Sequence, residues 1–195
     1  MMDGNNIFSL EGFVTFLVDQ SLVGLQTALG GILFGNGNDD GTIVEAPHDV
    51  MMIQSVDYWV NRIKIRSETD NTVYIEGIPS GTNRDEWIAT NVIHHGVPQP
   101  MYHLMSARSN KVMDECGNCP LNDRRILQWG YNGGHNQHWV FVKYDRWWWS
   151  QPEYKIVNVW SGHHLTRVNG DVRLMGKSSY GYDHNKQRWY IHDRG

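Results

Sequence analysis

The sequence predicts an all-β domain built from three repeats of about 50 residues. The clearest evidence is a phrase that occurs three times: a short polar segment, then a tryptophan, then β-forming residues. Its copies occupy residues 83–89, 136–141 and 185–191. The tryptophans Trp87, Trp139 and Trp189 lie 52 and 50 residues apart. A fixed period of this length indicates a repeat architecture.

A second shared segment precedes each tryptophan phrase, at residues 50–55, 102–109 and 154–161. The serines that end these segments lie 54 and 52 residues apart: Ser55, Ser109 and Ser161. Proline precedes each unit, as Pro47, as Pro98 with Pro100, and as Pro152. Because proline lacks a backbone donor and is poorly tolerated in a central strand, it suits such joints. We therefore expect a repeat domain over residues 47–195, with units of about 48–97, 98–150 and 151–195.

Each unit is expected to form four short strands separated by turns. In the third unit these are residues 154–159, 164–168, 172–175 and 188–192. Turn residues recur roughly every eight to twelve positions, without a long helical period, which is typical of a sandwich or barrel. A propeller needs about four or more blades. Three units therefore predict a β-trefoil, in which Trp87, Trp139 and Trp189 meet on the pseudo-threefold axis as core residues.

Composition excludes several function classes. The 195 residues suit one domain with an extension, and nine Trp with nine Tyr fit a small β core of large aromatic residues. A net charge of −4 gives no attraction to nucleic acid, so we expect no nucleic-acid partner. Three consecutive tryptophans at 147–149 favour linker packing, with an adhesive surface ridge as the alternative. We find no nucleophile elbow and no Gly-rich phosphate loop, and we expect neither an enzyme nor a cofactor.

The two cysteines form a single C-x-x-C motif, Cys116 and Cys119. A zinc site would need two further ligands at similar spacing, and a thioredoxin-type motif would need a βαβ context. We therefore expect no metal site. The motif is interpreted as a turn, which a small-ring disulfide would close; that bond would imply an oxidising compartment.

Residues 1–46 differ from the rest of the chain, because their charge is −6 while the remainder carries +2. They contain no Lys or Arg, which excludes a signal peptide with a basic n-region and favours a cytoplasmic or non-classically secreted protein. Residues 20–38 are free of charge but contain too many polar residues and glycines for a transmembrane segment. The apolar residues within 7–34 favour self-association or docking, with a membrane-active arm as the alternative; the pattern does not separate helix from strand.

Residues 126–139 predict a β-hairpin with a ligand-binding end. β-forming residues flank a turn at Gly133-Gly134, as a hairpin requires. The turn brings Trp129, Asn136 and Gln137 to one end of the unit. An aromatic plate beside amide groups suits a sugar, which presents C–H groups on one face and hydroxyls around its edge. The segment resembles the repeat of ricin-type (R-type) lectin domains, whose hallmark is Gln-x-Trp.

The resemblance covers about residues 48–195 and implies a β-trefoil lectin with a galactose-type site. R-type repeats often read Ser-Gly-Lys-x-Leu-Asp, and residues 109–114 read Ser-Asn-Lys-Val-Met-Asp. Asp114 thus falls on the aspartate that grips the sugar, and Trp129 on the stacking aromatic. Asn136 matches the residue that bonds a sugar hydroxyl, and Gln137 the glutamine that supports the site. Leu127 departs from the pattern, since a glutamine is common there.

The other two units resemble structural repeats without a working site. In unit three, Thr166, Met175 and Lys186 stand at the aspartate, aromatic and asparagine positions. In unit one, a weak alignment places Val60 and Glu76 at the first two. We therefore expect one sugar site per chain. In the plainer alternative, Asp114 closes an Asx-turn and Trp129 is a core residue.

A single weak site favours joining several chains, so we expect a homo-oligomer held through residues 1–46, with glycans or glycoproteins as partners. Two other functions stay open. One is a structural protein that polymerises through the same segment, with sugar binding incidental. The other is a lectin-targeted toxin or defence protein whose N-terminal arm acts on membranes.

Overall fold

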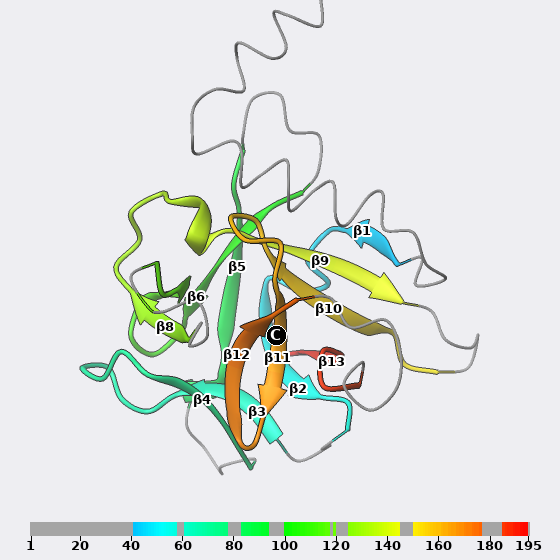
Figure 1. Ribbon diagram of the computed structural model, residues 1–195, viewed down its shortest axis with the longest axis horizontal. Coiled ribbons are helices and arrows are strands. Elements are labelled where there is room, and N and C mark those ends of the chain that lie inside the picture. Colours follow the sequence, from blue (N-terminus) through cyan, green and yellow to red (C-terminus); the bar gives the residue numbers. More distant parts are fainter. Residues whose placement is uncertain are drawn as a thin grey trace, which may run out of the picture.

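Three four-stranded units and one added strand make up the described part of the chain (Figure 1). The computed structural model describes residues 41–57, 61–77, 83–93, 100–117, 119, 125–144, 150–176 and 185–194, without the side chains of residues 75–77. Apart from two single-turn 3-10 helices and one helical residue, Asn185, the regular structure in these ranges is β-strand.

The first unit contains β2 (Val50–Ser55), β3 (Asn61–Ile65), β4 (Val73–Gly77), the 3-10 helix η1 (Asn83–Asp85) and β5 (Trp87–Asn91). The second contains β6 (Tyr102–Ser106), β7 (Val112–Glu115), β8 (Ile126–Trp129), the 3-10 helix η2 (His135–Gln137) and β9 (Trp139–Tyr144). The third contains β10 (Glu153–Asn158), β11 (His164–Val168), β12 (Asp171–Met175) and β13 (Trp189–Asp193). The strands predicted for this unit differ from the observed ones by at most one residue at either end.

Six of these strands close into a ring. The first strand of each unit pairs antiparallel with the last strand of the same unit, through Met51–Trp87, Tyr102–Trp139 and Tyr154–Trp189. The last strand of each unit also pairs with the first strand of the next, as β5–β6, β9–β10 and β13–β2. The remaining strands of each unit form the hairpins β3–β4, β7–β8 and β11–β12. A six-stranded barrel with three hairpins is the β-trefoil that the sequence predicts.

The three repeated tryptophans have no exposed surface and hold each hairpin to the barrel by the same hydrogen bond. Each indole Nε1 donates at 3.0 Å to a backbone carbonyl of its own unit: Trp87 to Ile63, Trp139 to Met113 and Trp189 to Leu165. A buried indole N–H needs such a partner. These carbonyls therefore mark equivalent positions in the three units.

This equivalence corrects the predicted alignment of unit one. The residues after the marked carbonyls are Lys64, Asp114 and Thr166, so Lys64 stands at the aspartate position and the assignment of Val60 is wrong. The position of Glu76 is confirmed, because it faces Arg62 across β3–β4 as Trp129 faces Val112 across β7–β8.

The alignment of the serines also needs correction. Ser55, Ser106 and Asn158 lie opposite the three tryptophans in the sheet. Ser55 is thus equivalent to Ser106, three residues before the serine with which the sequence aligned it. The 54-residue spacing arose from this shift.

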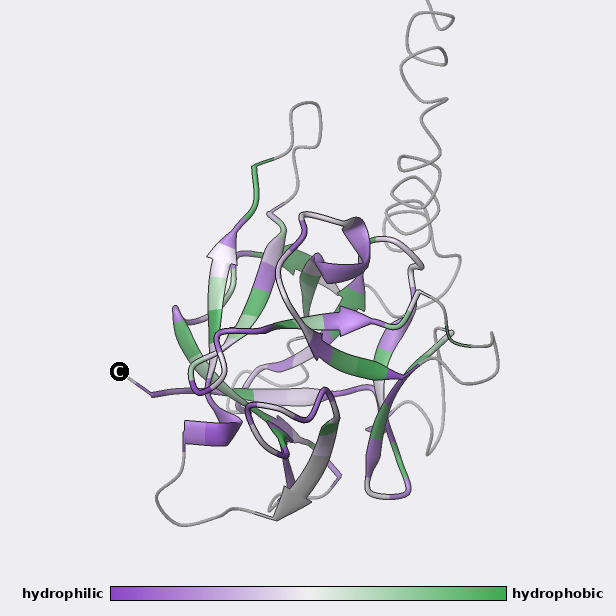
Figure 2. Cartoon of the chain, turned by 90° about the vertical axis from the view of Figure 1, so that its left-hand side faces the viewer, coloured by the Kyte–Doolittle hydropathy of each residue, from purple (hydrophilic) through white to green (hydrophobic). Residues whose placement is uncertain are grey.

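The core lies inside the barrel and beneath the hairpins. Apolar residues concentrate on the strands, whereas the loops and the 3-10 helices are largely hydrophilic (Figure 2). Strands such as β6 alternate buried and partly exposed residues, because successive side chains point to opposite faces. Burial of this apolar surface is the main stabilising contribution to the fold.

The added strand β1 (Thr42–Val44) belongs to the N-terminal segment of residues 1–46 and pairs with β9. Val44 and Ala46 pack against the main core, and the hydroxyl of Tyr102 donates a hydrogen bond to Glu45. The end of this segment is therefore part of the trefoil sheet. The predictions of self-association and of a membrane-active arm concern residues 1–40, which lie outside the described residues.

Candidate functional site

The β7–β8 hairpin places Asp114 and Trp129 on one face. Val112 pairs with Trp129 and Asp114 with Leu127. Directly opposed residues share a face of the sheet, and side chains two apart along a strand point the same way. Asp114 and Trp129 are therefore diagonal neighbours on the outer face. The residues between them, Met113 and Gln128, are fully buried on the opposite face.

Two amide side chains hold the carboxylate of Asp114, one at each oxygen. The Nδ2 of Asn136 donates to Oδ1 at 3.1 Å, and the Nε2 of Gln137 donates to Oδ2 at 2.8 Å. The same nitrogens also donate to backbone carbonyls, Asn136 to Glu115 at 3.2 Å and Gln137 to Gly130 at 2.9 Å. Asp114 is thus fixed in position, with lone pairs remaining on both oxygens.

The loop between β8 and β9 is shaped to deliver Asn136 and Gln137. Gly133 has a φ of 76°, a left-handed conformation that glycine adopts without steric cost. A Cβ at Gly134 would lie 2.5 Å from Oδ1 of Asn136, so a larger residue here would displace the Asn136 side chain. The backbone N–H of Asn132 donates to Oε1 of Gln137 at 2.8 Å. Both ends of the Gln137 amide are therefore engaged.

Asp114 is only 6% exposed, and burial raises the pKa of its carboxyl although the hydrogen bonds from Gln137 and Asn136 oppose the shift. In this low-dielectric setting a hydrogen bond to the ionised carboxylate is stronger than the same bond at an open surface. A ligand hydroxyl that reaches Asp114 would meet a strong, pre-oriented acceptor.

Two aromatic residues at the end of β8 are exposed. Trp129 and Tyr131 each keep 50% of their surface accessible, and they flank Gly130. The ring of Tyr131 packs against His103, with centroids 4.5 Å apart. The alternative in which Trp129 is a core residue is therefore wrong. No role was predicted for Tyr131, although its position two residues after Trp129 indicates the same end of the hairpin.

Unit three retains the scaffold of this arrangement without its carboxylate. The Nε2 of Gln187 donates to Oγ1 of Thr166 at 3.2 Å and to the carbonyl of Gly176 at 2.7 Å. These contacts correspond to those that Gln137 makes with Asp114 and Gly130. Met175, at the Trp129 position, is 49% exposed.

Unit one replaces the site with buried charges. Lys64, at the Asp114 position, is 1% exposed, and Asp85 stands at the position of Gln137, two residues before the tryptophan. Arg62 donates to Asp85 at 2.9 Å. A buried cation cannot accept a hydrogen bond from a sugar hydroxyl.

An open depression of about 310 Å³ adjoins the site at Trp129 and Gly130. It is lined by Thr69, Asn71, Lys111, Trp129 and Gly130. Thr69 and Asn71 come from the β3–β4 turn of unit one, and the other three come from unit two. The depression was not predicted, because no pattern within a repeat indicates which turn of another unit lies alongside it.

Cys116 and Cys119 form a disulfide in the loop after β7, with Cα atoms 5.4 Å apart. Within the described ranges, no three His, Cys, Asp or Glu side chains gather as metal ligands. No helix in the same ranges is both long and apolar enough to cross a bilayer.

No protein-family model matches the chain, and no curated protein matches it significantly. Solved structures do show a likeness. ThreeFoil, a designed threefold symmetric protein, matches 74% of this chain and 99% of its own at 22% identity and a TM-score of 0.56. The BEL β-trefoil matches 76% of this chain and 93% of its own at 12% identity and a TM-score of 0.57.

The lectin of Polyporus squamosus, solved with the epitope Neu5Acα2-6Galβ1-4GlcNAc, matches 76% of this chain at 19% identity and a TM-score of 0.59. The match covers 50% of that lectin, so this chain corresponds to about half of its length. At these identities the likenesses establish the β-trefoil fold.

Proposed function

We propose that this chain is a lectin without catalytic activity, which binds one galactose-type sugar at Asp114, Trp129, Asn136 and Gln137. The observation that carries the proposal is the Asp114 carboxylate. It is held at both oxygens by Asn136 and Gln137, on the same face of the hairpin as a half-exposed tryptophan.

The arrangement matches the chemistry of a pyranose. The free lone pairs of Asp114 accept hydrogen bonds from two neighbouring hydroxyls, and charged acceptors form the stronger bonds. The Trp129 indole covers the C–H patch of the ring, which galactose presents on one side. Asn136 fixes orientation through its carbonyl oxygen, because its nitrogen is occupied by Asp114 and Glu115.

Two further observations support the proposal, the first for a single site in unit two and the second for sugar binding. Thr166 and Lys64 occupy the equivalent positions of the other units, and neither supplies a carboxylate. A structural neighbour, the Polyporus squamosus lectin, is bound to an epitope that contains galactose. The galactose preference in this proposal comes from the resemblance to R-type lectins.

The test is an NMR titration of the full chain with methyl β-galactoside, which measures the Kd. A shallow monosaccharide site has a Kd of about 1 mM, or about −4 kcal/mol. Asp114→Ala and the milder Asp114→Asn should both abolish binding. Thr166→Ala, the matched change in unit three, should leave the Kd unchanged.

Unfolding in urea separates loss of the site from loss of the fold. Asp114→Ala leaves the buried Gln137 amide without one acceptor, which costs about 1–3 kcal/mol of stability. If Thr166→Ala weakens binding as much as Asp114→Ala, the site has been assigned to the wrong unit. If the unaltered chain binds no sugar on a glycan array, the proposed function is wrong.

A further inference from the structure

The depression beside Trp129 is built from two units of the trefoil. The backbone N–H of Gln128 donates to the carbonyl of Asn71 at 2.9 Å, which attaches the β3–β4 turn to β8. The Nζ of Lys111 donates to Oδ1 of Asn71 at 2.9 Å, which attaches the same turn to the start of β7. Two independent contacts therefore hold the walls of the depression.

Trp129 and Gly130 belong to both the depression and the Asp114 site. Trp129 lines the depression and shares the outer face of the hairpin with Asp114. The carbonyl of Gly130 accepts a hydrogen bond from Gln137, which in turn holds Asp114. Because Trp129 and Gly130 join the two, a second sugar linked to one at Asp114 can pass the Trp129 ring into the depression.

Hydrogen-bond donors dominate the far wall of the depression. Lys111 carries three N–H donors and no acceptor, and one of them is directed to Asn71. Because Oδ1 of Asn71 accepts that bond, its amide nitrogen supplies further donors. Thr69 adds a hydroxyl. This wall suits a ligand group that is rich in acceptors.

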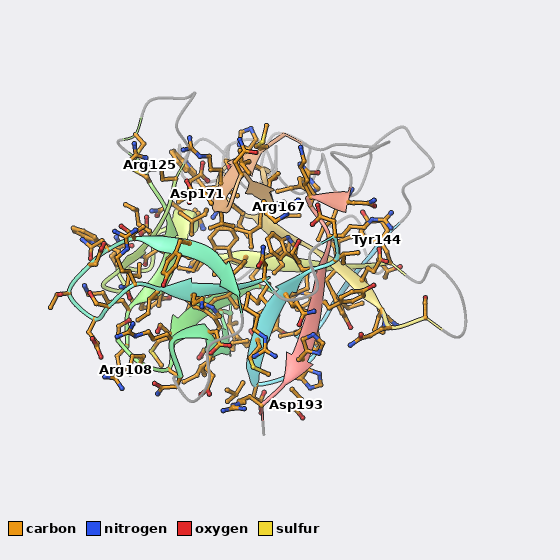
Figure 3. The ribbon with its side chains drawn as sticks, turned by 90° about the horizontal axis from the view of Figure 1, so that it is seen from below. Arg108, Arg125, Tyr144, Arg167, Asp171 and Asp193 are labelled. Carbon is orange, nitrogen blue, oxygen red and sulfur yellow. A yellow bond between two sulfur atoms is a disulfide. The ribbon has the colours of Figure 1, made fainter. Side chains whose placement is uncertain are left out.

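The charges around the depression also favour an anion. Glu68 pairs with Arg108, which lies at the periphery of the molecule in Figure 3, and Asp70 lies 3.8 Å from Arg66. Asp70 also interacts with the charge of Lys111. The three cations Arg66, Arg108 and Lys111 therefore exceed the two acidic residues of the turn by one positive charge. A local positive charge next to an aromatic plate stands out in a chain whose net charge is −4.

We infer that the depression lined by Thr69, Asn71, Lys111 and Trp129 is a second subsite, which binds an anionic sugar linked to the sugar at Asp114. The inference rests on the proposed function and adds the class of glycan. The shared chemistry is a carboxylate or a sulfate on the outer sugar. Lys111 provides the charge, Asn71 orients it, and Trp129 separates the two subsites.

Calorimetric or NMR titration of four ligands tests this subsite: methyl β-galactoside, lactose, 3′-sialyllactose and 3′-sulfolactose. An exposed ion pair contributes up to about 1 kcal/mol, so at least one anionic ligand should bind about three- to fivefold more tightly than lactose. Salt at about 0.5 M should remove most of that difference, because exposed charges are screened. Preference for the sialylated or the sulfated ligand identifies the anion.

Lys111→Gln should reduce the affinity for the anionic ligand to that for lactose, while methyl β-galactoside binds as before. Lys143→Gln, which removes the same charge from β9, should change none of the four affinities. Equal binding of lactose and both anionic ligands would overturn the subsite, as would an anionic preference that survives Lys111→Gln. If methyl β-galactoside and lactose also fail to bind, the proposed function is wrong, and so is the subsite that rests on it.

Discussion

The Nε2 of Gln137 donates a hydrogen bond to Oδ2 of Asp114 at 2.8 Å. The Nε2 of Gln187 makes the equivalent bond in unit three, to Oγ1 of Thr166 at 3.2 Å. The supporting glutamine is therefore present in unit three although the carboxylate is not. The difference between a proposed site and a scaffold lies in a few outer residues and not in the backbone that carries them.

A second sugar site should therefore appear when unit three is given the side chains of unit two. The change is Thr166→Asp with Met175→Trp and Lys186→Asn. Gln187 is already placed to hold a carboxylate at residue 166, and residue 175 is already half exposed. NMR titration with methyl β-galactoside should show two binding sites of about 1 mM each. Thr166→Asp without the other two changes is the control and should bind more weakly, because it lacks the aromatic plate.

Removal of the indole should weaken sugar binding more than removal of the equivalent methionine. Trp129 and Met175 have almost the same exposed fraction, so the two truncations remove comparable open surface. Trp129→Ala should raise the Kd for methyl β-galactoside about tenfold, since a nucleic-acid base stacked on an aromatic ring contributes about 1–3 kcal/mol and a sugar ring stacks in the same way. Met175→Ala should leave it unchanged. Isothermal titration calorimetry measures both, and equal effects would contradict the assignment of Trp129.

Sugar affinity should decrease in acid because Asp114 must be ionised to accept two hydroxyl bonds. Burial raises the pKa of this carboxyl above its ordinary value of 3.8. Binding should therefore begin to fall while the pH is still above 3.8, and NMR titrations at descending pH measure the midpoint. An affinity that stays constant down to pH 3.8 would contradict this role.

The effect of the same group on stability has the opposite sign. Because the folded pKa lies above the unfolded one, Asp114 favours folding at pH values below 3.8. That contribution is lost as the pH rises through the raised pKa. Chemical unfolding across this range distinguishes the two effects, because protonation of Asp114 in acid removes sugar binding while it favours the folded state.

The position of β1 determines how the N-terminal segment should be truncated. Deleting residues 1–46 removes Val44, Ala46 and the acceptor for Tyr102, which should cost about 2–3 kcal/mol of stability. Deleting residues 1–40 keeps β1, and should yield a folded chain that binds sugar with unchanged affinity. If oligomers form through this segment, light scattering should show a monomer after the shorter deletion. The shortened chain should also no longer agglutinate cells. Oligomers that persist would place the interface on the trefoil.

The repeat and its core were predictable because the same residue, tryptophan, performs the same structural task in all three units, as Trp87, Trp139 and Trp189. The four residues proposed for the site also lie together, since all of them belong to the β7–β8 hairpin and the loop that follows it. The hairpin predicted over residues 126–139 was wrong, because β8 pairs with β7 and not with β9. Unit one was misaligned because its residue at this position, Lys64, is a buried cation. The other two units have the smaller polar residues Asp114 and Thr166 there. Counting 23 residues back from Trp189 gives Thr166, and the same count from Trp87 finds Lys64.

The depression beside Trp129 could not be predicted in this way, because no repeated sequence pattern marks its residues. Thr69 and Asn71 lie in a turn whose sequence is not repeated in the other units, and they meet Lys111 only through the closure of the ring. Sequence periodicity describes what each unit has in common. Contacts between unlike parts of neighbouring units depend on the packed structure.

The pairing of β13 with β2 has a consequence for the order of folding. Ile53 faces Ile191 across these strands, although 138 residues separate them in the chain. During synthesis β2 cannot pair with β13 until β13 has been made. Until then, this edge of β2 stays unpaired and its apolar side chains stay exposed. Contacts of such long range are slow to form. The newly made chain is therefore most vulnerable to aggregation just before its final strand emerges from the ribosome.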